Sequence, residues 1–82
     1  WYRKAAEQGN ADAQLQLGGM YFNGRGVAQD YKQSYAWFSS AVANGYSDAV
    51  KARDIMAKRL TPAALAEGQQ LATRYFEQYR PK

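Results

Sequence analysis

Few side chains in this sequence could carry out catalysis. The 82 residues include no histidine and no cysteine, so imidazole bases, thiol nucleophiles and the usual zinc ligands are absent. Among the seven carboxylates, Asp12, Asp30 and Asp48 fall where helices are expected to start. The helix dipole favours acids at such positions, so capping explains these residues better than acid–base chemistry. The residues therefore predict a protein that is not an enzyme and that holds no metal or cofactor.

The segment Gly24-Arg25-Gly26 contains the G-x-G pattern found in phosphate-binding loops. It follows an expected helix rather than a strand, and no P-loop lysine comes after it. We therefore interpret the segment as a connection between two helices, in which the glycines adopt positive φ angles.

A basic cluster lies near the middle of the chain, whose net charge is +4. Four of the eleven basic residues fall within nine positions, at Lys51, Arg53, Lys58 and Arg59. Such a cluster could meet nucleic acid or an acidic lipid surface. A solvated helix face is the more common reason for it, since cations near a helix C-terminus also complement the dipole. Nucleic-acid binding is therefore disfavoured, and weak polyanion binding through residues 51–59 stays an alternative.

Start and stop signals divide the chain into five expected helices. Glycine and asparagine, which accept positive φ, end helices before Gly9, at Asn23-Gly24 and at Gly45. Asp30 with Gln33 fits a capping box, and Thr61-Pro62 fits an N-cap followed by a favourable first helical residue. The expected helices span residues 1–8, 11–22, 30–45, 48–59 and 62–79. No period-two alternation predicts a sheet, and no apolar run approaches the roughly 18 residues of a membrane span.

The last expected helix has the clearest periodicity. Its apolar stripe consists of Ala64, Leu65, Gly68, Leu71, Ala72, Tyr75, Phe76 and Tyr79. A helix with one apolar face belongs at the end of a stack, and Gly68 would permit a close approach to its neighbour. We predict a capping helix, with a partner-binding helix as the alternative.

The pattern of the first residues of the chain recurs 36 positions later. The pattern Trp1-Tyr2-x-x-Ala5-Ala6-x-x-Gly9 recurs as Trp37-Phe38-x-x-Ala41-Val42-x-x-Gly45. Recurrence at this spacing is typical of stacked repeats, in which each unit closes its apolar face against a neighbour. Repeat stacks offer extended surfaces more often than reactive pockets, so the pattern predicts partner binding.

Three motifs connect these copies to a known family. They read A-x-x-x-L-G-x-x-Y, G-x-G-V-x-x-D-Y and W-[YF]-x-x-A-x-x-x-G, and with them the chain resembles the Sel-one-like repeat, a subfamily of the tetratricopeptide-like helical repeats. The residues that match the motifs are Ala13, Leu17, Gly18, Tyr21, Gly24, Gly26, Asp30, Trp37, Ala41 and Gly45.

The resemblance implies an all-α fold: a short α-α superhelix, or solenoid, of antiparallel helix pairs with a C-terminal capping helix. Residues 1–60 would hold the second half of one repeat, one complete repeat and the first half of a degenerate terminal repeat. Residues 61–82 would form the capping helix and tail. The resemblance also implies an adaptor in protein complexes, in the bacterial periplasm, at the cell envelope or secreted, whereas the sequence itself fixes no compartment.

The second repeat copy departs from the motif, because Arg53, Asp54 and Ala57 stand where Leu17, Gly18 and Tyr21 would recur. Terminal repeats diverge because one face meets water. We therefore expect the stack to end at the C-terminal side and to continue before Trp1. The open edge, formed by Trp1, Tyr2, Ala5 and Ala6, predicts self-association.

The helix at residues 11–22 carries two apolar stripes on opposite sides. Ala13, Leu17, Met20 and Tyr21 form the expected core stripe, and Leu15, Gly19 and Phe22 form the other. The positions equivalent to this second stripe in the next copy hold Lys51, Ile55 and Lys58. Because unpaired lysines are rarely buried, we predict that these six residues form a partner-binding surface. The tetratricopeptide-like class, whose concave face is lined by the first helix of each pair, implies the same surface. Burial of both stripes between neighbouring repeats is the alternative.

Overall fold

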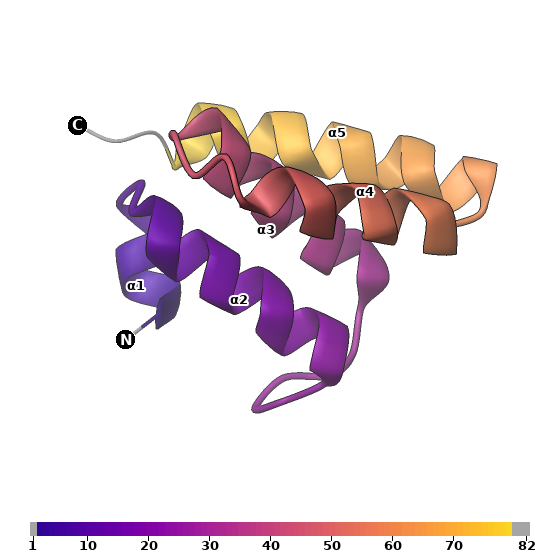
Figure 1. The fold of residues 1–82 in the computed structure, drawn as a ribbon, viewed down its shortest axis with the longest axis horizontal. Coiled ribbons are helices and arrows are strands. Elements are labelled where there is room, and N and C mark those ends of the chain that lie inside the picture. The colour runs from indigo at the N-terminus through magenta and orange to yellow at the C-terminus, as the bar shows by residue number, and fades with distance from the viewer. Residues whose placement is uncertain (1, 80–82) are drawn as a thin grey trace.

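The computed structural model describes residues 2–79, which form five α-helices and no strand (Figure 1). The helices are α1 (Tyr2–Glu7), α2 (Ala11–Asn23), α3 (Tyr31–Ala43), α4 (Ala49–Arg59) and α5 (Pro62–Gln78). The predicted all-α class is confirmed. The expected helix limits agree with the observed ones to within about two residues, the usual uncertainty at helix ends.

Polar side chains begin three of the helices. The Asn10 side chain accepts a hydrogen bond from the Ala13 amide at the start of α2, at 2.9 Å. At the start of α5, Thr61 Oγ1 accepts from the Ala64 amide at 3.2 Å and Pro62 is the first helical residue, as predicted. Each side chain satisfies an amide that has no partner within its helix.

The start of α3 differs in part from the capping box. Asp30 Oδ1 accepts hydrogen bonds from the amides of Lys32 and Gln33, at 3.0 and 3.2 Å. The reciprocal bond is missing, because the Asp30 amide donates to the Tyr21 carbonyl at 3.0 Å and the Gln33 side chain accepts from the Tyr75 hydroxyl. The capping-box prediction was therefore wrong for Gln33, whose side-chain Oε1 instead accepts the bond that links α3 to α5.

The prediction of a side-chain cap was also wrong for Asp48. Its backbone is already helical, with φ −64° and ψ −20°, and its side chain accepts no hydrogen bond from α4. An N-cap needs an extended backbone for its side chain to turn back onto the first turn. The helix dipole is the remaining reason for an acid at this position.

Helix α3 lies at the centre of the stack. It packs against α2, α4 and α5, while α1 packs against α2. Figure 1 shows α1 and α2 on one side of the molecule and α4 and α5 on the other. The helices α1, α2 and α3 thus stack in order, and α4 and α5 both pack on α3, in agreement with the predicted solenoid.

The core lies where α3 meets α2 and α5. Its buried members are Ala6, Ala13, Leu17, Ala36, Trp37 and Tyr75, with Met20, Tyr21, Leu71, Ala72 and Tyr79 packed against them. The Trp37 ring lies 4.5 Å from the Tyr75 ring and 5.5 Å from the Tyr79 ring, measured between centroids. The predicted core stripe of α2 and most of the stripe of α5 are therefore confirmed.

Two details of α5 refine that stripe. A Cβ added at Gly68 would lie 3.2 Å from Tyr35 Cδ1, so this glycine does permit a close approach to α3. Phe76, in contrast, keeps 38% of its surface exposed and does not belong to the buried stripe. Tyr75, one residue earlier, points into the core, and successive helical residues are rotated by about 100°.

The N-terminal edge is less apolar than expected. Ala6 is completely buried and Ala5 is half-buried against the core, whereas Tyr2 is 39% exposed. Trp1, the fourth member of the predicted edge, lies outside the described residues. The prediction that Ala6 is exposed was wrong because α1 already packs on α2 through this residue.

A buried glutamine links three helices. Gln14 is fully buried; its Nε2 donates to the Ala6 carbonyl and its Oε1 accepts from Asn44 Nδ2, both at 2.9 Å. These bonds connect α1, α2 and the residue that ends α3. Apolar periodicity does not indicate such a residue, because it assigns polar side chains to the exposed face of a helix.

Candidate partner-binding surface

The six predicted surface residues lie on the two helices that flank α3. Leu15, Gly19 and Phe22 belong to α2 and are half-buried, whereas Lys51, Ile55 and Lys58 belong to α4 and are exposed. We call this set the α2–α4 surface. Ile55 keeps 50% of its surface exposed, the largest exposed fraction among the large hydrophobic residues described.

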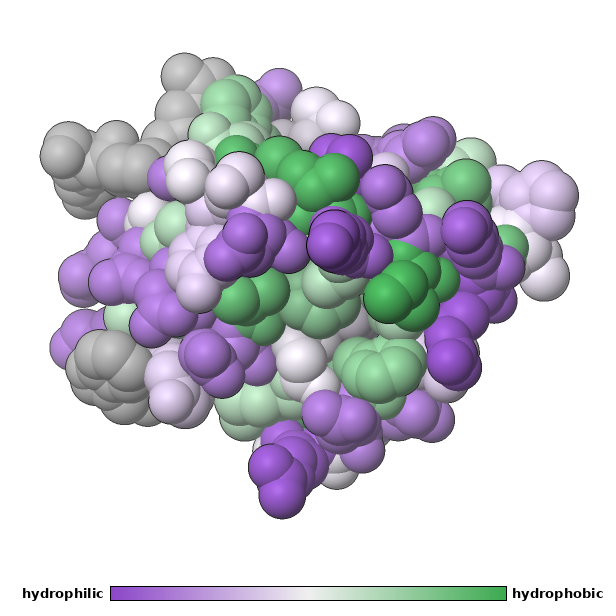
Figure 2. Space-filling model, viewed as in Figure 1, coloured by the Kyte–Doolittle hydropathy of each residue, from purple (hydrophilic) through white to green (hydrophobic). Residues whose placement is uncertain are grey.

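An apolar depression lies between the two helices. It has a volume of about 100 Å³ and is lined by Phe22 from α2, Phe38 from α3, and Ala52, Ile55 and Met56 from α4. Figure 2 shows hydrophobic residues gathered between α2 and α4 on this face of the molecule. The fold thus brings Phe22 and Ile55 to one site, together with three residues that the sequence analysis did not select.

Two of the three overlooked residues follow a signal that the sequence carries. Ala52 and Met56 are four residues apart, so they share one face of α4 and flank Ile55. The apolar periodicity of α4 would have found them, although the many charged residues of this helix weaken it. Phe38 is harder to find, because it follows the buried Trp37 and only the packing of α3 decides which neighbour it meets.

A glycine on α2 positions the floor of the depression. A Cβ added at Gly18 would lie 2.6 Å from Cδ1 and 2.7 Å from Cε1 of Phe38, closer than carbon atoms can approach. The Ser34 hydroxyl also donates to the Gly18 carbonyl at 2.8 Å. The glycine thus lets the Phe38 ring lie directly against α2, where it forms part of the site.

Arg59 covers the aromatic side of the surface. Its guanidinium carbon lies 5.3 Å from the centre of the Phe22 ring and 5.9 Å from that of Tyr31, and the two rings are stacked at 5.8 Å. Cation–π contacts at exposed sites contribute about 0.5–1 kcal/mol. Arg59 therefore helps to hold Phe22 in place and sets a positive charge beside the depression.

The other cations of the basic cluster fall into two groups. Arg53 Nε lies 3.5 Å from Asp54 Oδ1, so this charge has a partner within α4. Lys51 and Lys58 are exposed on the same face as Ile55, from which they are separated by four and three residues. The exposed lysines of α4 thus lie on the helix face that Ile55 shares.

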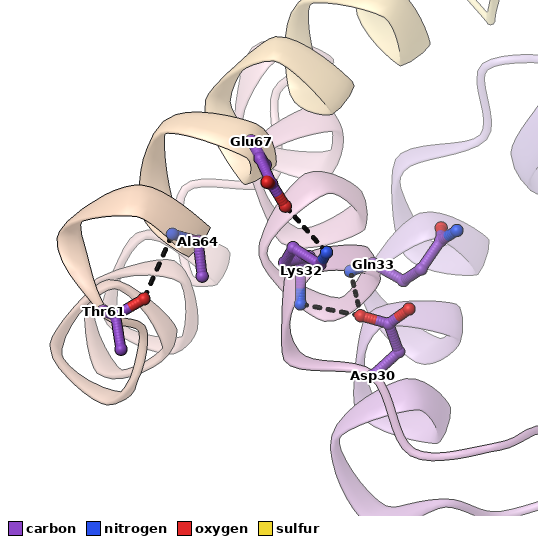
Figure 3. A network of polar contacts seen from close by, with 6 residues as sticks. All are labelled: Asp30, Lys32, Gln33, Thr61, Ala64 and Glu67. Atoms are coloured by element: carbon purple, nitrogen blue, oxygen red, sulfur yellow. Dashed lines mark hydrogen bonds and ion pairs between the residues drawn. The ribbon is translucent and has the colours of Figure 1, made fainter.

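A more polar depression lies between α3 and α5. It is lined by Asp30, Lys32, Gln33, Glu67, Gln70, Leu71 and Arg74. Figure 3 shows that Lys32 Nζ reaches Glu67 Oε2 at 2.8 Å, beside the caps made by Asp30 and Thr61. The Glu67 carboxylate, through its hydrogen bond and its charge, raises the pKa of Lys32 above its ordinary value. Because Lys32 and Glu67 pair with each other and Asp30 caps α3, we assign this depression a structural role.

The residues that match the repeat motifs occupy structural positions. Ala13, Leu17, Trp37 and Ala41 are buried, and Tyr21 is half-buried and accepts a hydrogen bond from Arg3. The glycines that end helices or shape the loop have positive φ: Gly24 at 71°, Gly26 at 73° and Gly45 at 102°. The Gly24 amide donates to the Met20 carbonyl at 2.8 Å and so closes α2.

Within residues 2–79, no group of three or more acidic, histidine or cysteine side chains could hold a metal ion. None of the described helices is both long enough and apolar enough to span a membrane.

Comparison with known proteins places the chain in a family. The model of the Sel1 repeat matches residues 1–10 and 11–46. A crystal structure of c5321, described as a protective antigen present in uropathogenic Escherichia coli strains displaying an SLR fold, is similar to this chain with a TM-score of 0.93 and 44% identity. The similarity covers 96% of this chain and 17% of that one, so this chain spans about one-sixth of that protein's length. No curated protein matches. The family model covers more than half of the residues and the matching structure almost all of them, and the chain belongs to the Sel1 repeat (Sel-one-like repeat) family.

Proposed function

We propose that this chain is a protein-interaction module that binds a protein or peptide partner on its α2–α4 surface and that it performs no catalysis. Sel1 repeats are helical repeats that generally serve in protein interaction, which supports the general role. The observation that carries the proposal is the apolar depression at which Phe22 and Ile55 meet, with Ile55 half exposed. Interfaces depend on such central apolar contacts surrounded by polar residues.

The distribution of contacts supports the choice of this face. The opposite side of α2 is covered by α1 and the core, and the apolar stripe of α5 is largely used against α3. At the α2–α4 surface the side chains of Phe22 and Ile55, from two helices, remain partly accessible above the buried Phe38 and Met56. A partner segment could bury them without disturbing the core.

Two further roles are weaker candidates. Residues 61–82 could cap a longer array whose partner binds elsewhere, in which case the α2–α4 surface would have no ligand of its own. The cluster at residues 51–59 could bind polyanions, but Asp54 contacts Arg53 and Arg59 covers two aromatic rings, which leaves fewer cations for a phosphate backbone. Binding to random DNA that falls steeply with salt would favour the polyanion role.

Self-association through α1 is the other candidate among partners. Tyr2 is 39% exposed and Ala5 half-buried, whereas Ala6 has no surface left to contribute. Sedimentation velocity over a range of concentrations tests it: a monomer at the highest concentration would exclude an edge-to-edge dimer.

The main test uses the chain as bait in a lysate of its source organism, with mass spectrometry of the captured proteins. The Phe22→Asp, Ile55→Asp double variant removes the apolar contact, and an Ala66→Asp, Gln69→Asp variant adds the same charge on the exposed face of α5. Circular dichroism checks that each variant is folded. Because Phe22 is half-buried, Ile55→Asp alone provides a milder second variant.

The outcomes separate the candidate roles. Under the proposal, a partner is captured by the wild type and by the α5 control but is lost with both surface variants, and the purified partner reproduces this pattern. Equal capture by folded wild type and folded surface variants would refute the α2–α4 surface and favour the capping role. Capture of nothing would refute the interaction role for this chain.

A further inference from the structure

The charges around the apolar depression define the chemistry of its partner, if the chain binds there as proposed above. We propose that the α2–α4 surface binds an acidic peptide segment that inserts one aliphatic side chain into the depression. The inference rests on the proposed function and makes it specific: the ligand is neither a basic segment nor a purely apolar one.

The size of the depression limits the inserted group. Its volume of about 100 Å³ is smaller than the roughly 150 Å³ of an engineered protein cavity that accommodates benzene. Its walls are formed by Phe22, Phe38, Ala52, Ile55 and Met56, none of which offers a side-chain hydrogen bond. An aliphatic side chain such as leucine, isoleucine or methionine fits this space, whereas an indole would be too large and would leave its N–H without a partner.

The α4 side of the depression is positively charged. Lys51 precedes Ile55 by four residues, and Lys58 and Arg59 follow it by three and four, so all four side chains share one face of the helix. The three cations are exposed, and the single acid of α4, Asp54, contacts Arg53. Carboxylates that flank the inserted side chain would therefore meet Lys51 and Lys58, while Arg59 lies over the Phe22 and Tyr31 rings.

The three α2 members of the surface are uncharged, and the space beside Gly19 is open. Leu15, Gly19 and Phe22 carry no charge, and a Cβ added at Gly19 would meet nothing within 4 Å. A peptide backbone can therefore approach α2 closely at this glycine while its acidic side chains extend toward α4. The surface thus combines an apolar depression, uncharged residues on α2 and cations on α4, which together match an acidic segment with one apolar residue.

The test selects ligands without prior assumption, from a phage-displayed library of random dodecapeptides. The peptides selected on the wild-type chain are then each tested for binding to the folded Ile55→Asp variant. Selected peptides are then synthesised, and their affinities are measured by fluorescence anisotropy at two salt concentrations. A Lys51→Glu, Lys58→Glu variant reverses the charge of the surface, and a Lys4→Glu, Arg74→Glu variant makes the same change in net charge on α1 and α5.

The proposal predicts peptides with two or more acidic residues around one leucine, isoleucine or methionine. Their affinity should fall about tenfold or more with the reversed surface charge and change less than twofold with the control. Peptides that depend on Ile55 but are neutral or basic would overturn this inference and leave the proposed function standing. Polyacidic peptides that still bind the Ile55→Asp variant would also overturn it, because they would need no apolar depression. A selection that yields no peptide dependent on the surface would refute both proposals.

Discussion

The adjacent glycines of α2 should respond to the same substitution in opposite directions. Gly18 and Gly19 both lie inside the helix, where alanine is favoured over glycine by about 1 kcal/mol. Their surroundings differ: an added Cβ would lie 2.6 Å from Phe38 at Gly18 and would meet nothing within 4 Å at Gly19. The same methyl group therefore tests packing at one position and helix propensity alone at the other.

The expected change in the free energy of unfolding combines two contributions, the clash with Phe38 and the helix propensity. Phe38 is only 6% exposed, so relief of the clash at Gly18 requires the ring to move into the depression or α2 to move away from α3. Overpacking of this kind destabilises by about 1–3 kcal/mol, and the contact is close enough to expect the upper part of that range. After the gain in propensity, Gly18→Ala should lose about 1–2 kcal/mol and lower Tm by roughly 5–15 °C. Gly19→Ala should gain up to about 1 kcal/mol.

Urea unfolding followed by circular dichroism measures both variants against the wild type. The expected difference between them is about 2–3 kcal/mol, well above the error of paired midpoints at a common slope. If Gly18→Ala were as stable as Gly19→Ala, the close contact between α2 and Phe38 would be refuted. Gly18 would then not position the floor of the depression.

Three further predictions concern the scaffold. Gln14→Leu should destabilise the chain by about 1–2 kcal/mol in urea unfolding, because the Asn44 side chain loses its partner and the Ala6 carbonyl keeps only its bond from the Gly9 amide. Gln16→Leu at an exposed position should change little, and equal effects would contradict the buried network. Thr61→Ala should lower the free energy of unfolding by about 1 kcal/mol, because the cap of α5 is lost, and Asp48→Ala should lower it much less, because the Asp48 side chain caps no helix. A larger effect at Asp48 in the same assay would contradict these cap assignments. Burial raises the pKa of the Tyr75 hydroxyl above its ordinary 10.0, so Tyr75 ionises first in the unfolded chain, and its contribution to stability is complete below pH 10 and is lost as the pH rises further. The free energy of unfolding of Tyr75→Phe should therefore fall less steeply between pH 9 and 11 than that of the wild type. Parallel curves would count against this.

Local signals in the sequence were sufficient to predict where the helices begin and end. Gly24 and Gly45 end helices and Thr61 begins one because capping depends on residues that are neighbours in the chain. The signals failed where a distant residue competes for the same atoms. Gln33 was expected to close a local capping box, but Tyr75, far along the chain, donates to its side chain instead.

The sequence by itself determined the all-α class, the helix limits, the repeat and the stripe of α2 that holds Leu15 and Phe22, since all of these follow from spacing along one chain. Only the tertiary structure decided that Phe22 and Ile55 meet, that Phe38 lies between them against Gly18, and that Arg59 reaches across to α2. The physical reason is that periodicity gives the direction of a side chain on its own helix. Which helices face each other, and how closely, is set by packing of the core between them.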